Sequence, residues 1–206
     1  MTGVQTCALP IYQGVSEGDM FLFFGRYCKV EQLSNGKWKY DADAQDIHAM
    51  FGWMQIGKIY ENVVTNAAKQ NVVHDYPSLA KHPHLIDDSD TVANNTVYVA
   101  KQGKLTIDEM ETDVESSGQF TYSNKVCLSF MDNKPKYLMS KWQLPLQCDD
   151  KHCYSYMTYD RPIDQYTSLF KSPPIGQEIV IDCKRIKAHH PNEYKIFMKY
   201  ILELFE

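Results

Sequence analysis

The sequence lacks several features that would assign it to a common class. No hydrophobic run approaches the roughly 20 residues of a membrane-spanning helix, so we expect no membrane partner. Basic residues are not in excess either, because 26 acidic and 21 basic side chains give a net charge of -5. Since phosphate neutralisation supplies most affinity for duplex DNA, non-specific duplex binding is disfavoured and any DNA contact is expected to be local.

The motifs of the common nucleotide and hydrolase chemistries are also missing. The sequence contains no phosphate-binding P-loop, no dinucleotide-type glycine fingerprint and no nucleophile elbow. Triphosphate and serine-hydrolase chemistries are therefore disfavoured in this part of the chain, and the pattern indicates no particular cofactor.

The cysteines form no regular framework. Five of the six lie beyond the first eleven residues, at irregular spacing: Cys28, Cys127, Cys148, Cys153 and Cys183. An odd number without a repeating interval fits a reducing compartment better than a set of disulfides. We therefore predict a cytoplasmic protein.

The stretch from Gly18 to Tyr60 organises the chain. Met20–Phe24 is apolar at every position, as in a strand covered on both faces, and Ala49–Tyr60 is rich in aromatic and branched residues. Between them, Asn35 and Gly36 form a strong turn signal. The pattern predicts two long, twisted antiparallel strands joined by a ragged connection, with glycines marking bulges or the close approach of a backbone or ligand.

The remaining pattern predicts a strand-dominated α+β fold. Thr96–Lys101 and Gly176–Cys183 alternate as strands do, and from Pro191 apolar residues recur at helical spacing. Asn62–Asp75 is predicted to be irregular, and the acidic segment Leu105–Gly118 to be a loop or a frayed helix. We expect a twisted antiparallel sheet or partial barrel with the C-terminal helix packed on it.

Shorter elements are predicted in the segments between. Tyr76–Lys81 is expected to form one helical turn, capped by Asp75 and ended by Pro83. Three further segments are candidates for short strands: Phe120–Tyr122, Val126–Met131 and Tyr137–Met139.

Two motifs carry a resemblance to a known family. Gly-Asp-x-Phe-Leu-Phe-Phe-Gly starts at Gly18, and Asp-x-His-x-x-Phe-Gly-x-x-Gln-x-Gly-x-Ile starts at Asp46. Together with segments 81–84, 94–100, 142–156 and 176–182, they resemble the third family of nucleotide-modification-associated domains. The resemblance covers most of the chain from about Gln13 onward. It implies a component of a bacterial or phage DNA base-modification system, with a nucleotide, a modified base or other system proteins as partners.

The beginning of the chain does not fit that pattern. Residues 1–11 resemble a translated sequencing adapter fused to an environmental reading frame, so we exclude them from the domain. The family resemblance further implies a preceding portion with a Ser-Arg-Lys-Gly-Phe-Asp type motif, which nothing here matches. We therefore predict a single domain over 12–206 that is truncated at its N-terminus.

Four residues are candidates for catalysis. Asp46 and His48 alternate on one face of a predicted strand, where a carboxylate can fix the tautomer of an imidazole and raise its basicity; a turn residue and a core histidine are the plainer alternative. His82 and His84 flank a proline and could contact substrate or phosphate. A catalytic metal site takes at least three protein ligands, so a third would have to come from His48, His74 or Asp87. We predict no metal.

Four further residues are candidates for substrate binding. Gln55 and Asn95 are amides suited to the edge of a base, whereas Trp53 and Tyr98 could stack against its face. A core amide bonded to the main chain, and aromatic rings packed in the core, are the plainer alternatives. The basic segment 184–190 is either a phosphate site at a helix start or a solvated linker.

Three functions remain open. The chain could act on a base or nucleotide in a pocket between glycine-broken strands. It could instead be a non-catalytic reader of modified bases, similar to small barrels of the PUA and EVE type, or a structural subunit of such a system.

Overall fold

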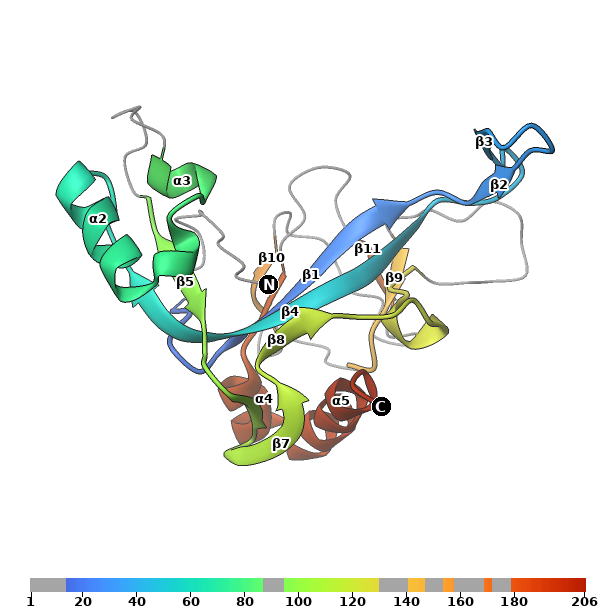
Figure 1. The fold of residues 1–206 in the computed structure, drawn as a ribbon. Helices are drawn as coiled ribbons and strands as arrows, with labels where there is room; N and C mark the ends of the chain where they lie inside the picture. The colour runs from blue at the N-terminus through green and yellow to red at the C-terminus, as the bar shows by residue number, and fades with distance from the viewer. Residues whose placement is uncertain (1–13, 87–94, 130–140, 147–153, 158–168, 172–178) are drawn as a thin grey trace. The chain divides into compact units, whose positions relative to one another are not determined.

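A computed structural model of the chain describes residues 14–86, 95–129, 141–146, 154–157, 169–171 and 179–206. The described residues form a mixed α+β fold with more strand than helix (Figure 1). Its strands are β1 (Met20–Tyr27), β2 (Val30–Gln32), β3 (Trp38–Tyr40), β4 (Ile47–Tyr60), β5 (Val97–Ala100), β6 (Lys104–Ile107), β7 (Met110–Glu115), β8 (Ser117–Gln119), β9 (Lys141–Gln143), β10 (Tyr154–Met157), β11 (Leu169–Lys171) and β12 (Ile179–Ile181). Its helices are α2 (Asn66–Asp75), η1 (Pro77–Leu79), α3 (Pro83–Ile86), η2 (Asn124–Val126), α4 (Cys183–His189) and α5 (Pro191–Glu203).

The main sheet is built on β1 and β4, the two long strands predicted from the sequence. Its order is β1-β4-β5, and β8 also pairs with β4. The pairs β4–β5 and β4–β8 are antiparallel, as are the two-stranded sheets β2–β3, β6–β7, β9–β11 and β10–β12. The described strands form no closed barrel. The predicted fold class, an antiparallel α+β fold with a C-terminal helix, is confirmed.

The glycines of β4 and β8 mark close packing between strands. A Cβ atom on Gly57 would lie 2.4 Å from the Cα atom of Lys101, at the point where the β4–β5 register shifts. A Cβ atom on Gly118 would lie 2.5 Å from the ring of Trp53. Gly57 therefore admits a neighbouring strand, as the sequence predicts for glycine within this strand. Gly118, in a segment predicted to be a loop or a frayed helix, admits the ring of Trp53.

The connection between β1 and β4 is more regular than the ragged loop predicted. β2 and β3 pair antiparallel, with Gln32 opposite Trp38. The turn between them places Gly36 at a φ of 79°, a left-handed value that glycine adopts readily. The Leu33 N–H donates to the Lys37 carbonyl at 2.8 Å and closes the turn. Asn-Gly thus forms a defined hairpin of its own.

The segment after β4 contains a helix, which corrects the irregular structure predicted for Asn62–Asp75. Thr65 has extended dihedrals, and its hydroxyl accepts a hydrogen bond from the Ala68 N–H, which caps α2. Only Lys69 and Val72 are buried in α2, so its apolar periodicity is too weak to be recognised in the sequence.

The short turn that follows differs in detail from the prediction. η1 is present within Tyr76–Lys81, with Pro77 at its first position. Asp75 does not cap it, because that carboxylate accepts a hydrogen bond from the Tyr60 hydroxyl at 2.6 Å. Pro83 begins α3 rather than ending the turn, since proline is compatible with a first helical position.

The acidic segment Leu105–Gly118, predicted to be a loop or a frayed helix, forms the hairpin of β6 and β7. Asp108 and Glu109 make its two-residue turn, with φ values of 49° and 69°. Such turns need left-handed residues, and glycine or asparagine usually supplies them. Because neither is present here, the sequence gives no turn signal. Thr112 and Val114 are half-buried, whereas the acidic residues around them are exposed.

The short strands predicted further on are only partly present. Phe120–Tyr122 is irregular, and Val126–Met131 contributes isolated bridges from Cys127 to Ala49 and from Ser129 to Trp142. The third, Tyr137–Met139, lies outside the described residues. The predicted strand Gly176–Cys183 is present as β12 in its described part.

The C-terminal helix begins at Pro191, as predicted, and packs on the segment after β8. Its buried residues are Tyr194, Phe197 and Ile201. The Lys125 ammonium donates to the Glu203 carbonyl at 3.1 Å. This packing anchors α5 to the segment whose Cys127 bridges to β4.

Residues 184–189 of the basic segment 184–190 belong to a helix, α4, rather than to a linker, and His190 follows the helix end. Asp182 precedes the helix, and its carboxylate accepts a hydrogen bond from the Arg185 N–H at 3.0 Å. The phosphate site suggested by the sequence is at the start of the next helix, α5, which begins at Pro191, and it stays a prediction.

The described chain divides into two compact units. Unit 1 comprises the described parts of Met1–Leu22 and Gly52–Gln119, and unit 2 those of Phe23–Phe51 and Phe120–Glu206. β1 and β4 both pass from one unit into the other. The core of unit 1 joins α2, η1, α3 and β5 through Val63, Val72, Leu79, Leu85, Val97 and Val99. A single domain over 12–206 remains a prediction.

Candidate functional site

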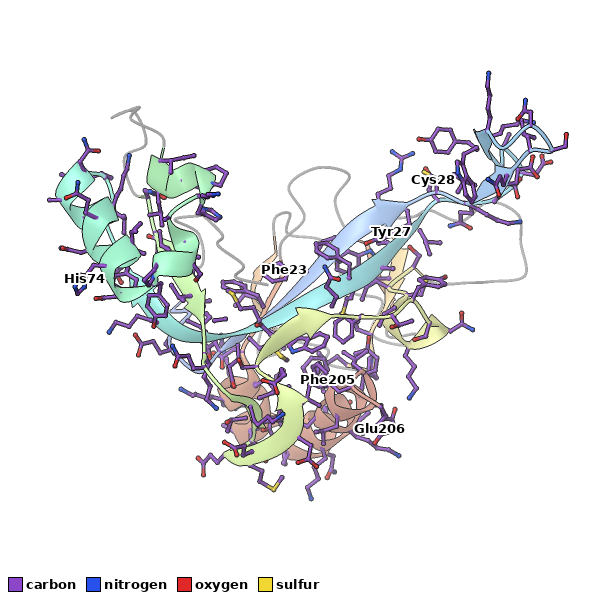
Figure 2. All side chains as sticks on the ribbon, in the orientation of Figure 1. Phe23, Tyr27, Cys28, His74, Phe205 and Glu206 are labelled. Carbon is purple, nitrogen blue, oxygen red and sulfur yellow. The ribbon has the colours of Figure 1, made fainter. Side chains whose placement is uncertain are left out.

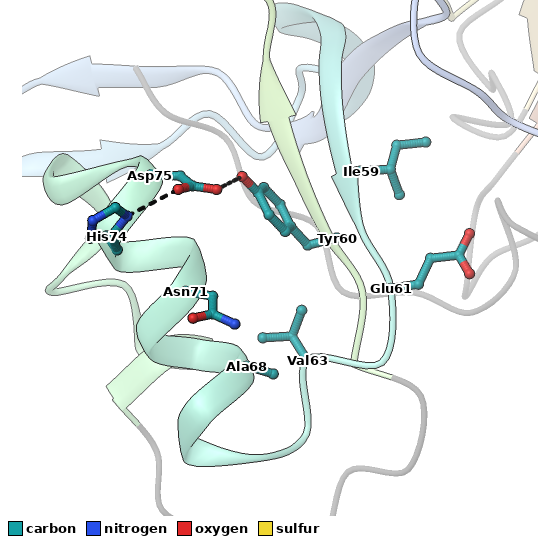
Figure 3. Close-up of a pocket in the computed structure, with 8 residues that line it drawn as sticks. All are labelled: Ile59, Tyr60, Glu61, Val63, Ala68, Asn71, His74 and Asp75. Atoms are coloured by element: carbon teal, nitrogen blue, oxygen red, sulfur yellow. Dashed lines mark hydrogen bonds and ion pairs between the residues drawn. The ribbon is translucent and has the colours of Figure 1, made fainter.

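A pocket in unit 1 lies between the end of β4 and helix α2 (Figure 3). Its cavity volume is about 510 Å³, within the usual range for ligand sites. Most of its lining residues are polar, and the full set is Ile59, Tyr60, Glu61, Val63, Ala68, Asn71, His74 and Asp75. The pocket therefore contains hydroxyl, amide and carboxylate groups beside the apolar side chains of Ile59, Val63 and Ala68.

The local sequence explains why these groups face one another. After β4 ends at Tyr60, Asn62 takes a left-handed φ of 55° and redirects the chain. Thr65 then caps α2, whose last turn carries His74 and Asp75. The helix consequently runs back along the strand end and presents its last turn to the Tyr60 ring (Figure 3).

A chain of hydrogen bonds joins the polar groups of the pocket. The Tyr60 hydroxyl donates to Asp75 Oδ2 at 2.6 Å, and His74 Nδ1 lies 3.2 Å from Asp75 Oδ1. Burial, followed by the Asp75 carboxylate, raises the pKa of the Tyr60 hydroxyl. The Tyr60 hydroxyl, followed by His74, lowers the pKa of Asp75. Near neutral pH the pocket therefore contains a protonated phenol and an ionised carboxylate.

The structure brings three of the predicted site residues together beside this pocket. The rings of His82 and His84 stack with centroids 5.5 Å apart. Asn95 Nδ2 donates to the Val63 carbonyl at 2.9 Å and to the His84 carbonyl at 3.3 Å. Because Val63 lines the pocket, Asn95 links the histidine pair to the pocket wall.

Asn95 and His82 differ in how their polar atoms are hydrogen-bonded and charged. Asn95 is 5% exposed, and its Oδ1 atom has no hydrogen-bond partner in the described part of the chain. Burial, followed by the charge of His84, lowers the pKa of His82, so that imidazole is neutral near pH 7.

Two predicted binding residues lie on β4 and contact the β6–β7 hairpin. Gln55 Nε2 donates to the carbonyls of Gly18 and Thr106 at 2.9 and 2.7 Å, and Gln55 Oε1 accepts from the Thr106 N–H at 2.9 Å. The Trp53 indole donates to the Glu115 carbonyl at 2.9 Å. The Gln55 amide thus ties the turn before β1 to β6, and a ligand contact by either residue stays a prediction.

The fourth predicted binding residue, Tyr98, is completely buried on β5. Its ring meets Phe21 edge to face, with centroids 5.2 Å apart. None of the eight predicted site residues lines the pocket beside Tyr60, although Asn95 contacts its wall.

Asp46 and His48 lie in unit 2, where each has a partner other than the predicted one. The Asp46 carboxylate accepts a hydrogen bond from Arg26 Nε at 2.8 Å. His48 is 2% exposed, and its Nδ1 atom accepts from the Trp142 indole at 2.9 Å. The rings of His48 and Phe24 also pack together. The imidazole proton is therefore on Nε2 in the neutral tautomer.

The charges of this second cluster follow from those partners. The Cys28 thiol, followed by Arg26, lowers the pKa of Asp46. Burial, followed by the charge of Arg26, lowers the pKa of His48. The predicted carboxylate–imidazole pair would instead raise the basicity of the imidazole, so the arrangement here differs from a general-base pair.

Sequence reasoning missed the residues that define the pocket. Tyr60 ends an apolar strand and reads as core, whereas Asn71 and Asp75 lie in a segment without helical periodicity. Only contact between β4 and α2 brings these side chains together, and no local pattern indicates that contact.

Comparison with known families identifies the chain. The family model of nucleotide modification associated domain 3 matches residues 5–182. The chain belongs to this family. The resemblance seen in the sequence is therefore confirmed, and nucleotide modification associated domain 3 is a domain associated with nucleotide-modification systems. No curated protein and no solved structure matches the chain.

The bounds of the family match bear on both ends of the chain. The match includes residues 5–11, which the sequence suggested to be an adapter, and it ends at Asp182, before α4 and α5. That residues 1–11 do not belong to the domain therefore stays a prediction. Among the described residues, no helix is both long enough and apolar enough to span a membrane.

Proposed function

We propose that the domain binds a nucleobase or nucleoside in the pocket beside Tyr60, as a component of a DNA or nucleotide base-modification system. The observation that carries the proposal is the pocket itself, in a chain of this family. Its volume of about 510 Å³ exceeds that of a single base and suits a nucleoside.

The chemistry of the pocket supports a base rather than a phosphate. Asn71 supplies both a donor and an acceptor, the pairing that amides make with base edges. Glu61 and Asp75 add carboxylates that can accept from an exocyclic amino group. The same two carboxylates repel phosphate oxygens, so the phosphates of a nucleotide would have to point away from the pocket.

The histidine pair is the nearest candidate for chemistry. We propose that His82 and His84 face the substrate, supported by the link from Asn95 to the pocket wall at Val63. His82 is neutral near pH 7, and its Nδ1 atom accepts a hydrogen bond from the His84 N–H at 3.3 Å, so its Nε2–H group could donate to the substrate. Roles for Asp46, His48, Gln55, Trp53 and Tyr98 in catalysis or binding remain proposals that rest on the sequence pattern.

Binding is tested with the purified chain and single nucleosides by calorimetry. Asn71→Ala should weaken binding about tenfold, as expected for loss of a base-edge contact worth ~1–3 kcal/mol. Gln70→Ala is the matched control, because it removes an amide from the neighbouring, exposed position of α2 that does not line the pocket. Equal affinities of the two variants would reject this pocket as the binding site.

Chemistry is tested in a host that carries the intact modification system. Replacing His84 or His48 by alanine should remove the modified nucleoside from digested DNA, as measured by mass spectrometry. Unchanged nucleoside spectra for both variants would reject a catalytic role.

A non-catalytic reader of modified bases is the second candidate. It is favoured by the hydrogen bonds of two residues predicted to be catalytic. Asp46 accepts from Arg26 and His48 accepts from Trp142, so both side chains already have partners within the protein. A reader should bind a modified oligonucleotide more tightly than the unmodified one, without turnover. Equal affinity for both oligonucleotides would count against it.

We also propose a cytoplasmic location, with DNA and other proteins of the system as partners. Support comes from the thiols of Cys28 and Cys127, which form no disulfide among the described residues, as expected in a reducing compartment.

A further inference from the structure

We propose that the β2–β3 hairpin binds single-stranded nucleic acid, stacking bases on Trp38 and Tyr40 and contacting phosphates through Lys37 and Lys39. This inference extends the proposed function, since it names the polymer that would carry the base to the domain. The four residues lie together in unit 2 on one short hairpin.

The two aromatic rings are displayed to solvent on the same face of β3. Trp38 is 66% exposed and Tyr40 is 70% exposed, although large aromatic side chains normally bury most of their surface. Alternate residues of a strand share a face and lie about 6.7 Å apart. That interval is about twice the rise between stacked bases, so one base fits between two such positions.

The backbone that carries these rings is already ordered. The Gly36 N–H donates to the Leu33 carbonyl at 2.9 Å, and the Lys37 N–H donates to Asn35 Oδ1 at 3.0 Å. At the base of the hairpin, the Asp41 N–H donates to the Lys29 carbonyl at 3.0 Å. A preformed hairpin loses little conformational entropy when a ligand binds, which favours affinity.

The charge of the hairpin is opposite to that of the chain. Residues 26–41 carry four basic and two acidic side chains, a net charge of +2, whereas the chain as a whole carries -5. Arg26 pairs with Asp46, and Lys29 pairs with Asp41 at 2.8 Å. The two remaining ammonium groups, on Lys37 and Lys39, form no ion pair within the described residues and are available to phosphates.

The negative residue on the hairpin does not cancel this charge. Glu31 lies opposite Lys39 in the β2–β3 register, but no ion pair joins them. Figure 2 shows side chains projecting around the hairpin, with Tyr27 and Cys28 at its base. Tyr27, the last residue of β1, is itself 42% exposed.

Single-stranded nucleic acid fits this surface better than a duplex or a protein. Unpaired bases stack readily on exposed aromatic rings, whereas the faces of paired bases are already covered by their neighbours. A duplex would also bring many phosphates close to an acidic chain. A protein partner would not need the two free ammonium groups beside the rings.

The test measures binding of a fluorescent oligothymidine of about 12 nucleotides by anisotropy at several salt concentrations. The double variant Trp38→Ala, Tyr40→Ala should raise Kd at least tenfold at every salt concentration. The double variant Lys37→Gln, Lys39→Gln should raise Kd at low salt and reduce the slope of log K against log salt by about 1.4, or about 0.7 per phosphate contact.

Matched controls lie elsewhere on the chain. Tyr122→Ala removes an aromatic ring that is also 62% exposed. Lys81→Gln with Lys195→Gln removes the same charge from two exposed lysines outside the hairpin. Neither control should change Kd more than twofold, and melting curves of all variants should coincide because the substituted side chains are exposed.

The outcomes separate this inference from the proposed function. Loss of oligonucleotide affinity in the hairpin variants, with nucleoside binding retained, supports the hairpin as a strand-binding element. Equal oligonucleotide affinity in hairpin and control variants overturns it, whether or not Asn71→Ala weakens nucleoside binding. Absence of oligonucleotide binding, or a self-association that Trp38→Ala with Tyr40→Ala abolishes, overturns it as well.

Discussion

At the scale of single residues, the sequence shows which side chains are unusual but not which atoms they contact. Alternation along the strand predicted from the sequence places Asp46 and His48 on one face, and it suggests that they interact. In the structure, Asp46 lies just before β4 begins at Ile47. The imidazole instead bonds to Trp142, 94 positions away, and the carboxylate to Arg26, 20 positions away. Partners at such separations depend on the folded arrangement of strands, which no local pattern specifies.

Gln55 shows the same limit and allows a prediction. Its amide makes three hydrogen bonds to the main chain of Gly18 and Thr106. Gln55→Leu should lower the free energy of unfolding by about 2–3 kcal/mol, because three part-buried hydrogen bonds to the main chain are lost. Urea denaturation measures the change, and Gln70→Leu, at an exposed position of α2, should stay within about 0.5 kcal/mol of the parent. Equal losses in both variants would contradict a structural role for Gln55.

His48 makes stability depend on pH. Because burial lowers the pKa of His48 below its ordinary value of 6.5, the unfolded chain takes up this proton first. The free energy of unfolding should therefore fall as pH drops below about 6.5, and this contribution should level off below the folded pKa. His48→Asn keeps an acceptor for the Trp142 indole but does not titrate. Its stability should depend less on pH between 7.5 and 5; parallel curves for parent and variant would contradict the prediction.

At the scale of elements, the sequence predicts those whose pattern is strong. β1, β4 and α5 carry long apolar or periodic runs, and all three are present where expected. α2 and the β6–β7 hairpin were missed because their polar residues outnumber their buried ones. α2 is stabilised by a cap and by a few core contacts, and the hairpin by its pairing. Neither a helix cap nor strand pairing produces a regular spacing of apolar residues, so neither element can be recognised from the sequence pattern.

The β6–β7 turn is strained enough to be improved. Glu109 has a φ of 69°, and a non-glycine residue there costs about 1–2 kcal/mol. Glu109→Gly removes that strain, and the greater freedom of glycine in the unfolded chain offsets about 0.5–1 kcal/mol of the gain. We expect a net stabilisation of about 0.5–1 kcal/mol in urea denaturation. Glu111→Gly, in extended β7, should instead destabilise the protein. A loss of stability in Glu109→Gly would show that the turn is unstrained.

At the scale of the whole molecule, the predicted site residues are divided between the two compact units. His82, His84 and Asn95 cluster in unit 1, whereas Asp46 and His48 belong to unit 2. The family match nevertheless runs through both units without interruption. The family match is therefore continuous in sequence over two compact units, and strands β1 and β4 contribute residues to each unit.

That sharing predicts how the chain unfolds. Because β1 and β4 supply strands to both units, neither unit can keep its sheet when the other loses these strands, and we expect one cooperative transition. Ile201→Ala in α5 should lower stability by roughly 3 kcal/mol. Amide hydrogen exchange is measured by mass spectrometry at increasing urea concentration. The substitution should lower the protection of β5 in unit 1 and of α5 in unit 2 by the same amount. Ile196→Ala, at a half-exposed position of the same helix, is the control and should change neither. Separate midpoints for β5 and α5 would mean two independent units, and the prediction of a single domain over 12–206 would then be wrong.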